Sequence, residues 1–481
     1  MKRFLLCILC LGAFIIAGCT VGPKYKKPSV PMTPAYKEPP PDSFKEGQGW
    51  KTAQPGDDKI KGKWWELFGD PRLNELEDEL TVSNQNLRIA QDRFIQARAQ
   101  IRFNRASLYP TISTSPSISS LRDSANKPYF TSATSATGDF VLPFDLSYEV
   151  DLWGRIRRTV TAAREEAQAT AADLETASLS LHAELAMDYF ELRSADAQKQ
   201  LLDDTLKAYA DTLKLAETRY EGGVAPKADV AQARTQLEQT QVQDTDTGVQ
   251  RAEFEHAIAV LIGKPPAAFG LAEAPLDLKP PVIPVGVPSE LLERRPDIAS
   301  AERRTAEANE QIGIAKASYY PTVTLSATGG FEGTSILNWL TWPSRFWAVG
   351  PQMLETIFDA GRRRAVSEQA LAGYDAEVAT YRQTTLSAFQ DVEDNLAALR
   401  ILSVEADQQK EAVDSAKESL QLAMNRYTGG LDNYLTVLAA QAIALFNERN
   451  EVDIQRRRMD ASVLLIKAVG GGWDVSQLPK L

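Results

Sequence analysis

Cysteine and histidine are almost absent from this sequence of 481 residues, which contains three cysteines and two histidines. All three cysteines, Cys7, Cys10 and Cys19, fall in the first 19 residues, so the rest of the chain cannot form a disulfide. His182 and His256 are isolated, and the chain has neither a His-Glu-x-x-His motif nor a phosphate-binding glycine loop. We therefore predict no enzymatic activity, no metal site and no cofactor.

Positive charge and long hydrophobic runs are also scarce. The formal net charge is −11 at pH 7, which argues against nucleic acid as a partner. The uncharged apolar run at residues 4–17 is too short to span a bilayer comfortably. Because this run follows Lys2 and Arg3, it predicts a secretory signal, whose removal would change the net charge from −11 to −13.

The leader ends in Ile-Ala-Gly followed by Cys19, a pattern that resembles the bacterial lipobox. We therefore expect cleavage after residue 18 and lipidation of Cys19, whose several acyl chains would form a strong membrane anchor. Thr20, rather than an aspartate, follows the cysteine, and by resemblance this favours sorting to the outer membrane. The alternative is an ordinary signal peptide that happens to contain cysteine.

The two halves of the sequence share several short motifs. The segment "LAETRYEGGV" at 215–224 returns 207 residues later as "LAMNRYTGGL" at 422–431, and "ASLYPT" at 106–111 returns as "ASYYPT" at 317–322. Echoes in the same order at nearly the same offset indicate two internal structural repeats. We expect a signal peptide (1–18), a lipidated tether and equatorial segment (19–71), the first repeat (72–262), a proline-rich linker (263–295), the second repeat (296–469) and a C-terminal segment (470–481).

Each repeat is expected to begin with a helix and to continue into two strands. The helices cover about residues 72–107 and 296–318, and each stops before a proline. Residues 140–152 alternate between apolar and mostly polar side chains, which is the period of a strand with one apolar face. The other strand patterns lie at 111–120, 322–331 and 346–358.

A long helical hairpin should complete each repeat. Residues 152–220 contain no proline and would form a helix of about 100 Å. The glycine pairs Gly222-Gly223 and Gly429-Gly430 can adopt the left-handed backbone that ends a helix, which places hairpin tips near 220–226 and 427–433. The fold class is therefore α+β, mainly α. The glycines are explained equally well by a plain turn and by a turn that contacts a partner.

Four strands with one apolar face cannot close into a barrel by themselves, and open sheet edges are not tolerated in hydrocarbon. Bacterial barrels begin at eight strands. Two chains would supply eight strands and three would supply twelve. The strand patterns therefore exclude a monomer without choosing between these assemblies.

Several motifs in a fixed order resemble the outer-membrane efflux protein (TolC) family, and within it the lipoprotein branch that serves resistance-nodulation-division pumps. The resemblance covers essentially the whole mature chain. The motifs are "GCTVGPKYKKP" (18–28), "WWELFGDPRLNEL" (64–76), "LLERRPDI" (291–298), "ASYYPT" (317–322), "IFDAGRRR" (357–364), "RYTGGLDNYLTVL" (426–438) and "GGGW" (470–473).

This resemblance implies a homotrimer with a twelve-stranded outer-membrane β-barrel, four strands per chain, continued by a twelve-helix periplasmic α-barrel. The implied function is passive exit for small molecules delivered by an inner-membrane pump through a periplasmic adaptor. The residues implied to contact the adaptor are Gly222, Gly223, Val224, Gly429, Gly430 and Leu431. The residues implied to narrow the periplasmic aperture are Tyr427, Asp432, Tyr434, Leu435 and Asp229.

This chain departs from the family pattern beyond the second tip, where Ala439 and Ala442 replace an acid and a base of many relatives. We therefore expect a closed aperture held by apolar and tyrosine contacts, with Asp432 forming an acidic ring that favours cations. Arginines near the starts of the long helices, capped by Asp151 and Asp359, are expected to meet either phospholipid headgroups or solvent. The alternatives for function are a lipid-anchored periplasmic adaptor or coiled-coil scaffold without a pore, and a secretion channel for whole proteins.

Overall fold

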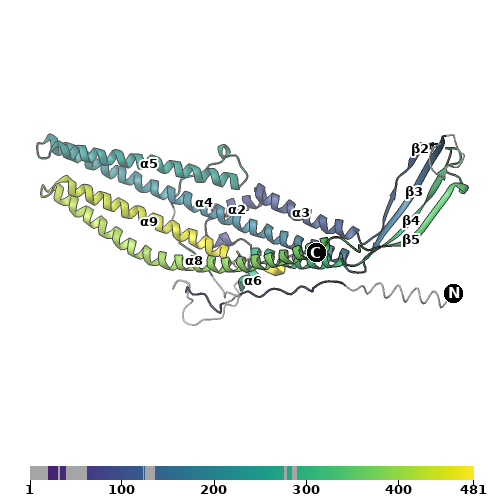
Figure 1. Cartoon of the computed structure of the whole chain (residues 1–481). Coiled ribbons are helices and arrows are strands. Elements are labelled where there is room, and N and C mark those ends of the chain that lie inside the picture. Colours follow the sequence, from purple (N-terminus) through teal and green to yellow (C-terminus); the bar gives the residue numbers. More distant parts are fainter. Residues whose placement is uncertain are drawn as a thin grey trace.

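The computed structural model describes residues 20–30, 33–38, 62–122, 124, 136–275, 279–283 and 290–481. The molecule is long and narrow: a β-sheet stands at one end, two helical hairpins point to the other, and the C-terminus lies between them (Figure 1). The expected signal peptide and Cys19 lie outside the described residues. No helix in the described part of the chain is both long and apolar enough to cross a membrane.

Two helices of 67 residues each, α4 and α8, run most of the length of the molecule. Each turns back at its tip into a helix of 35 residues, α5 after α4 and α9 after α8. The α-helices are α2 (Pro71–Ser83), α3 (Gln85–Ala106), α4 (Arg155–Glu221), α5 (Lys227–Leu261), α6 (Leu291–Arg294), α7 (Pro296–Ala317), α8 (Arg362–Thr428) and α9 (Tyr434–Ala468). The 3-10 turns are η3 (Trp64–Phe68), η4 (Pro266–Ala268), η6 (Trp342–Ser344) and η7 (Val475–Gln477).

The first helix of the first repeat is broken, contrary to the prediction of one helix over 72–107. Asn84 both ends α2 and begins α3, and its side-chain oxygen accepts a hydrogen bond from the Leu87 amide at 2.9 Å. Its side-chain nitrogen donates to the Leu261 carbonyl at the end of α5, at 2.7 Å. Asn84 therefore caps one helix and holds the end of another.

The sheet is antiparallel. It is four strands wide, because two of its short strands lie end to end along one edge. Its strands are β1 (Thr111–Thr114), β2 (Ser117–Leu121), β3 (Thr137–Val150), β4 (Thr322–Gly333) and β5 (Arg345–Leu354). The order is β1-β3-β4-β5, and β2 continues the line of β1 along β3 in the same register. The segment predicted as one strand over 111–120 is interrupted at Pro116, which has no N–H to donate to a ladder.

The two faces of the sheet differ in polarity. Cross-strand partners on one face are apolar, as in Leu146 opposite Ala327 and Tyr148 opposite Leu325. Partners on the other face are polar, as in Asp145 opposite Thr328, whose hydroxyl donates to that carboxylate. This alternation is what a sheet needs in order to separate hydrocarbon from water.

A compact waist joins the sheet to the hairpins. There the 3-10 turn η3 and helix α2 pack Trp64, Phe68 and Leu76 against α4. The buried waist also contains His182, whose ring stacks on Trp65 with centroids 4.4 Å apart. These contacts hold α4 around His182 and Phe190, near the middle of the helix, so the second half of α4 extends from the waist to the tip.

Candidate functional site at the hairpin tips

The two hairpins end in the same backbone turn. The amides of Val224 and Leu431 each donate 2.9 Å hydrogen bonds back to the carbonyls of Arg219 and Arg426, five residues earlier. This is a Schellman ending, which needs one residue with a left-handed backbone. Only the second glycine of each pair supplies it, with φ of 69° at Gly223 and 73° at Gly430.

The first glycine of each pair has an ordinary backbone. Gly222 and Gly429 both have φ of −72°, within the right-handed helical region. The left-handed residue expected from each glycine pair is therefore the second glycine. Beyond the turns, Val224 and Leu431 are exposed, so each tip presents one large apolar side chain to its surroundings.

A buried aromatic pair lies directly behind the second tip. The rings of Tyr427, at the end of α8, and Tyr434, at the start of α9, meet edge to face with centroids 5.5 Å apart. Both residues are buried, and burial raises the pKa of each phenol. The Tyr427 hydroxyl donates to the buried carboxylate of Asp229, on the first turn of α5, at 3.4 Å.

Arg219 connects the first hairpin to the second. Its guanidinium donates to the Thr428 carbonyl, the last of α8, at 2.9 Å. The same group lies 4.9 Å from the centre of the Tyr427 ring, a cation–π contact. The positive charge of Arg219 also interacts favourably with the partial negative charge at the carbonyl end of α8. Arg219 therefore fastens one hairpin across the other.

The predicted aperture residues divide into two groups. Tyr427, Tyr434 and Asp229 are brought together in the core between the hairpins of one chain. Leu435 is exposed, and Asp432 forms an ion pair with Arg426 at 2.8 Å. In this structure the tyrosines hold the hairpins together, and the charge of Asp432 is offset by its neighbour.

The sequence reasoning missed Arg219 and Gln441. The carbonyl oxygen and the side chain of Gln441 bind Tyr209 and Tyr434, at 3.2 and 3.3 Å. Arg219 belongs to the duplicated "RY" of the two tips, so the repeat itself was a signal. Gln441 had no such signal, because a glutamine in a helix is ordinarily solvated.

The arginines at the start of α4 have protein partners, contrary to the expectation that they meet lipid headgroups or solvent. The carboxylate of Asp151 accepts from the amides of Ile156 and Arg157, and Asp359 accepts from Gly361 and Arg363, so both aspartates are helix caps as expected. Arg155 pairs with Glu149, and Arg158 is buried against Glu310, each at 2.6 Å. Arg157 pairs with Asp151 at 3.1 Å, so these three arginines of α4 are compensated within the chain. Among the described residues, no cluster of histidine, cysteine and acidic side chains could hold a metal ion.

The family model for outer membrane efflux proteins matches residues 76–264 and 287–471. The chain belongs to the outer membrane efflux protein family. It is similar to the solvent efflux pump outer membrane protein SrpC of Pseudomonas putida, 33% identical over 474 residues, covering 96% of this chain and 97% of that protein. It is also 33% identical over 416 residues to the pyoverdine export outer membrane protein OpmQ of Pseudomonas aeruginosa, covering 85% and 87% of the two chains.

Among solved structures, the Campylobacter jejuni CmeC outer membrane channel has a TM-score of 0.88 at 25% identity, covering 95% of this chain and 96% of that one. The relatives are channel proteins of efflux systems, not enzymes. These similarities confirm the predicted fold class, the outer-membrane location and the function as an outer-membrane channel of an efflux system.

Proposed function

We propose that three copies of this chain form a complete outer-membrane β-barrel without free strand edges, and a continuous tunnel below it. The observation that carries this proposal is the open sheet. In the described part of the chain, β1 and β2 pair only with β3, and β5 pairs only with β4, so both outer lines of strands keep free backbone groups. Hydrocarbon does not tolerate such edges, and joining β5 of one copy to β1 and β2 of the next removes them.

In the described part of the chain, the two outer sides of the helical region are left uncovered, like the two edges of the sheet. α4 packs against α3, α5, α7 and α9, while α8 packs mainly against α7 and α9. The helices at the two outer sides, α3 and α8, expose large apolar side chains such as Ile95 and Phe103 on α3 and Leu371 and Ile401 on α8. A rotated copy would bring α8 of one chain to α3 and α5 of the next, which is the head-to-tail contact that closes a ring.

Three copies are favoured over two by the family resemblance and by the length of the helices. Twelve strands and the matching helices surround a tunnel, and α4 alone extends about 100 Å. We propose that a periplasmic adaptor docks on the exposed tips around Gly222, Gly223, Val224, Gly429, Gly430 and Leu431, and that a resistance-nodulation-division pump supplies the substrate. Lipidation at Cys19 would anchor each chain beside the barrel.

The substrates proposed are small organic molecules. The relatives named above are described as acting on solvents and on pyoverdine, which differ widely in polarity. A channel that serves such different cargo leaves most of the selection to its pump. The alternative of a lipid-anchored adaptor or scaffold is less favourable, because this chain has two long hairpins and an open amphipathic sheet.

Native mass spectrometry of the detergent-extracted, full-length mature protein tests the assembly, and conductance in planar bilayers tests the pore. We expect a trimer whose pore conducts almost no ions. The ion conductance should rise in Tyr434→Ala and in Leu435→Ala. Palmitate labelling that disappears in Cys19→Ser would support the anchor. A lipidated monomer that passes no ions would overturn the proposal, and unchanged closure in both variants would remove the tyrosine and leucine from the aperture.

A further inference from the structure

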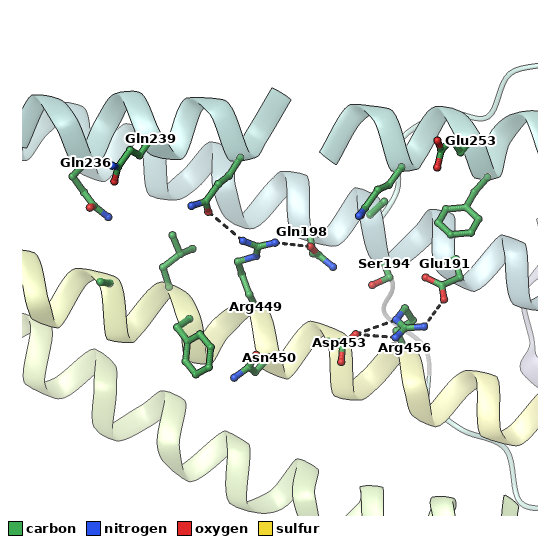
Figure 2. A pocket seen from close by; sticks show the side chains of 17 residues that line it. Glu191, Ser194, Gln198, Gln236, Gln239, Glu253, Arg449, Asn450, Asp453 and Arg456 are labelled. Carbon is green, nitrogen blue, oxygen red and sulfur yellow. Dashed lines mark hydrogen bonds and ion pairs between the residues drawn. The ribbon is translucent and has the colours of Figure 1, made fainter. Parts of the chain in front are cut away.

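A polar cleft opens between α4, α5 and α9, well away from the tips. It has a volume of about 830 Å³, which is enough for a drug-sized molecule. Its walls are rich in side-chain amides, contributed by Gln198, Gln236, Gln239, Gln243, Gln250 and Asn450. Figure 2 shows the amide of Gln198 meeting the side chain of Arg449 in the cleft. The Arg449 side chain also donates to the amide oxygen of Gln243.

The two arginines of the cleft have different surroundings. Arg456 forms ion pairs with Glu191 and Asp453 (Figure 2), and also with Asp460. Arg449 has no carboxylate within ion-pair distance among the described residues; it donates to the neutral side-chain oxygens of Gln243 and Gln198, at 3.1 and 3.5 Å. A guanidinium has five N–H donors, so Arg449 keeps both an uncompensated charge and unused donors.

A second polar group in the cleft is also unsatisfied. Ser194 is only 1% exposed, yet within the part of the chain that the structure describes its hydroxyl has no hydrogen-bond partner. Buried hydroxyls are normally paired, so an unpaired one in the wall of a cleft points to a missing ligand. Beside these groups lie Phe254, Leu445 and Phe446, and Phe446 is 64% exposed.

The repeat shows that the fold does not require these groups. Because α4 and α8 have equal lengths, as do α5 and α9, residues 207 apart are equivalent. The equivalent of Arg449 is Val242, which is 70% exposed, and the equivalent of Ser194 is Ile401. The first repeat thus folds with an exposed valine where the second has an arginine held between two glutamines.

We propose that this cleft binds amphiphilic organic monoanions, in which a carboxylate or sulfonate is attached to an aromatic or alkyl body. Arg449 would receive the anionic group through a bidentate pair of N–H donors, and Ser194 would donate to a polar atom of the ligand. Phe446 and Phe254 would contact the apolar body. Glu253 at the rim, and the carboxylates around Arg456, would disfavour a second negative charge.

This inference rests on the proposed function, because it makes the cleft a transit site for cargo. Glu191 and Gln198 lie about half a helical turn away from His182 and Tyr189, which pack against the waist. The cleft therefore opens on the face of α4 opposite the waist. A proposed ring that keeps the waist on the outside of its wall would place three copies of Arg449 facing the tunnel.

The test uses the full-length trimer in nanodiscs, with naphthalene-2-sulfonate as the anion and naphthalene-2-sulfonamide as its neutral counterpart. Binding is measured by calorimetry. We expect Arg449→Gln to weaken sulfonate binding roughly tenfold to hundredfold, the usual loss for a charge-assisted pair. Arg457→Gln is the matched control, since Arg457 lies on the same helix outside the cleft and pairs with Glu405. It should bind like the parent protein.

Three results would overturn the inference: unchanged sulfonate binding in Arg449→Gln, equal affinity for the neutral sulfonamide, or the same loss in Arg457→Gln. Partial block of a conducting channel by the sulfonate, absent in Arg449→Gln, is a second expected readout. A trimer that conducts but shows none of these effects would refute the binding site and leave the channel intact. A protein that forms no channel would refute the proposed function first.

Discussion

The two hairpin tips share one backbone and differ in what surrounds it. Tyr220 and Tyr427 occupy equivalent positions before the glycine turn, yet Tyr220 is 44% exposed and Tyr427 is 2% exposed. The residue that faces Tyr427 is Tyr434, and its equivalent in the first hairpin is Lys227. The difference between Tyr434 and Lys227 on the neighbouring helices therefore accompanies the burial of Tyr427 and the exposure of Tyr220.

The same division holds for the charged residues. Arg219 reaches across to the second hairpin, whereas its equivalent Arg426 pairs with Asp432 inside its own hairpin. Asp229 meets Tyr427, and its equivalent is Thr436. After duplication, the first hairpin supplies polar clamps and the second supplies the aromatic core that they hold.

The largest expected difference between the tips comes from removing each tyrosine. Tyr427→Ala should destabilise the packing between the hairpins by about 3–5 kcal/mol, as for a buried aromatic side chain. Tyr220→Ala should change it by less than about 0.5 kcal/mol, because Tyr220 is exposed. Leak conductance in planar bilayers should therefore rise in the first variant only. Equal leak in both would show that the burial difference has no bearing on closure.

Removing the arginines should give a smaller contrast. Arg219→Ala loses a hydrogen bond to a carbonyl and a cation–π contact, which together contribute about 1–3 kcal/mol. Arg426→Ala loses an exposed ion pair of about 0.5 kcal/mol. Spin labels on the two tips would report a wider distance distribution for Arg219→Ala. The idea of a clamp between hairpins fails if the two variants give the same distribution.

The waist offers a comparison that depends on pH. His182 Nδ1 lies 2.6 Å from the carboxyl of Glu77, whereas the equivalent of His182 in the second repeat is Phe389. Burial raises the pKa of Glu77 well above its usual value and lowers the pKa of His182 to about 4. The negative charge of Asp78 favours protonation of both groups. The Glu77 carboxyl therefore keeps its proton to a higher pH in the folded chain than in the unfolded chain.

Above about pH 6.5 the imidazole is neutral in the unfolded chain as well, so the raised pKa of Glu77 alone makes the folded chain bind more protons than the unfolded chain. Stability should therefore fall by about 1.4 kcal/mol per pH unit until Glu77 ionises in the fold. Glu77→Gln should remove this part of the slope in thermal unfolding between pH 6.5 and 8.5. His256→Gln, which changes an exposed histidine, should keep the parent slope. A slope retained in Glu77→Gln would contradict the raised pKa of Glu77.

The glycine turns should show the smallest effect. Gly223→Ala places a side chain on a left-handed backbone and should cost about 1–2 kcal/mol. Gly222→Ala keeps an ordinary helical backbone, so it should be neutral or slightly stabilising. The same contrast is expected between Gly430→Ala and Gly429→Ala. Thermal unfolding of the four variants measures it, and equal losses within a pair would contradict the assigned φ angles.

The long elements were predictable because their signals are local. The absence of proline and the glycine pair placed the long helix at 152–220, and the structure has it at Arg155–Glu221. Alternation of apolar and mostly polar side chains placed a strand at 140–152, and the structure has it at Thr137–Val150. The break at Asn84 was not predictable, because it is held by the Leu261 carbonyl, which is distant in sequence.

The candidate site was predictable only in part. Duplication located both tips, and resemblance named Tyr427, Tyr434 and Asp229. Neither could show that these residues pack inside one chain, since Tyr220 and Tyr427 carry the same local sequence pattern. Their difference arises from contacts between helices. The Arg449 cleft was likewise invisible, because its arginine and glutamines come from three separate helices.

The unpaired borders of the sheet also constrain how the protein must be made. A newly exported protomer has two sheet edges whose backbone groups are unpaired in the described part of the chain. Each edge can pair with any compatible strand, including a strand of a misaligned copy. In the proposed trimer, insertion of single chains would leave these backbone groups without partners in lipid, so we expect oligomerisation to precede or accompany entry into the bilayer. Biogenesis should accordingly depend steeply on protomer concentration, and escort proteins that mask strand edges would suppress the growth of open-ended polymers.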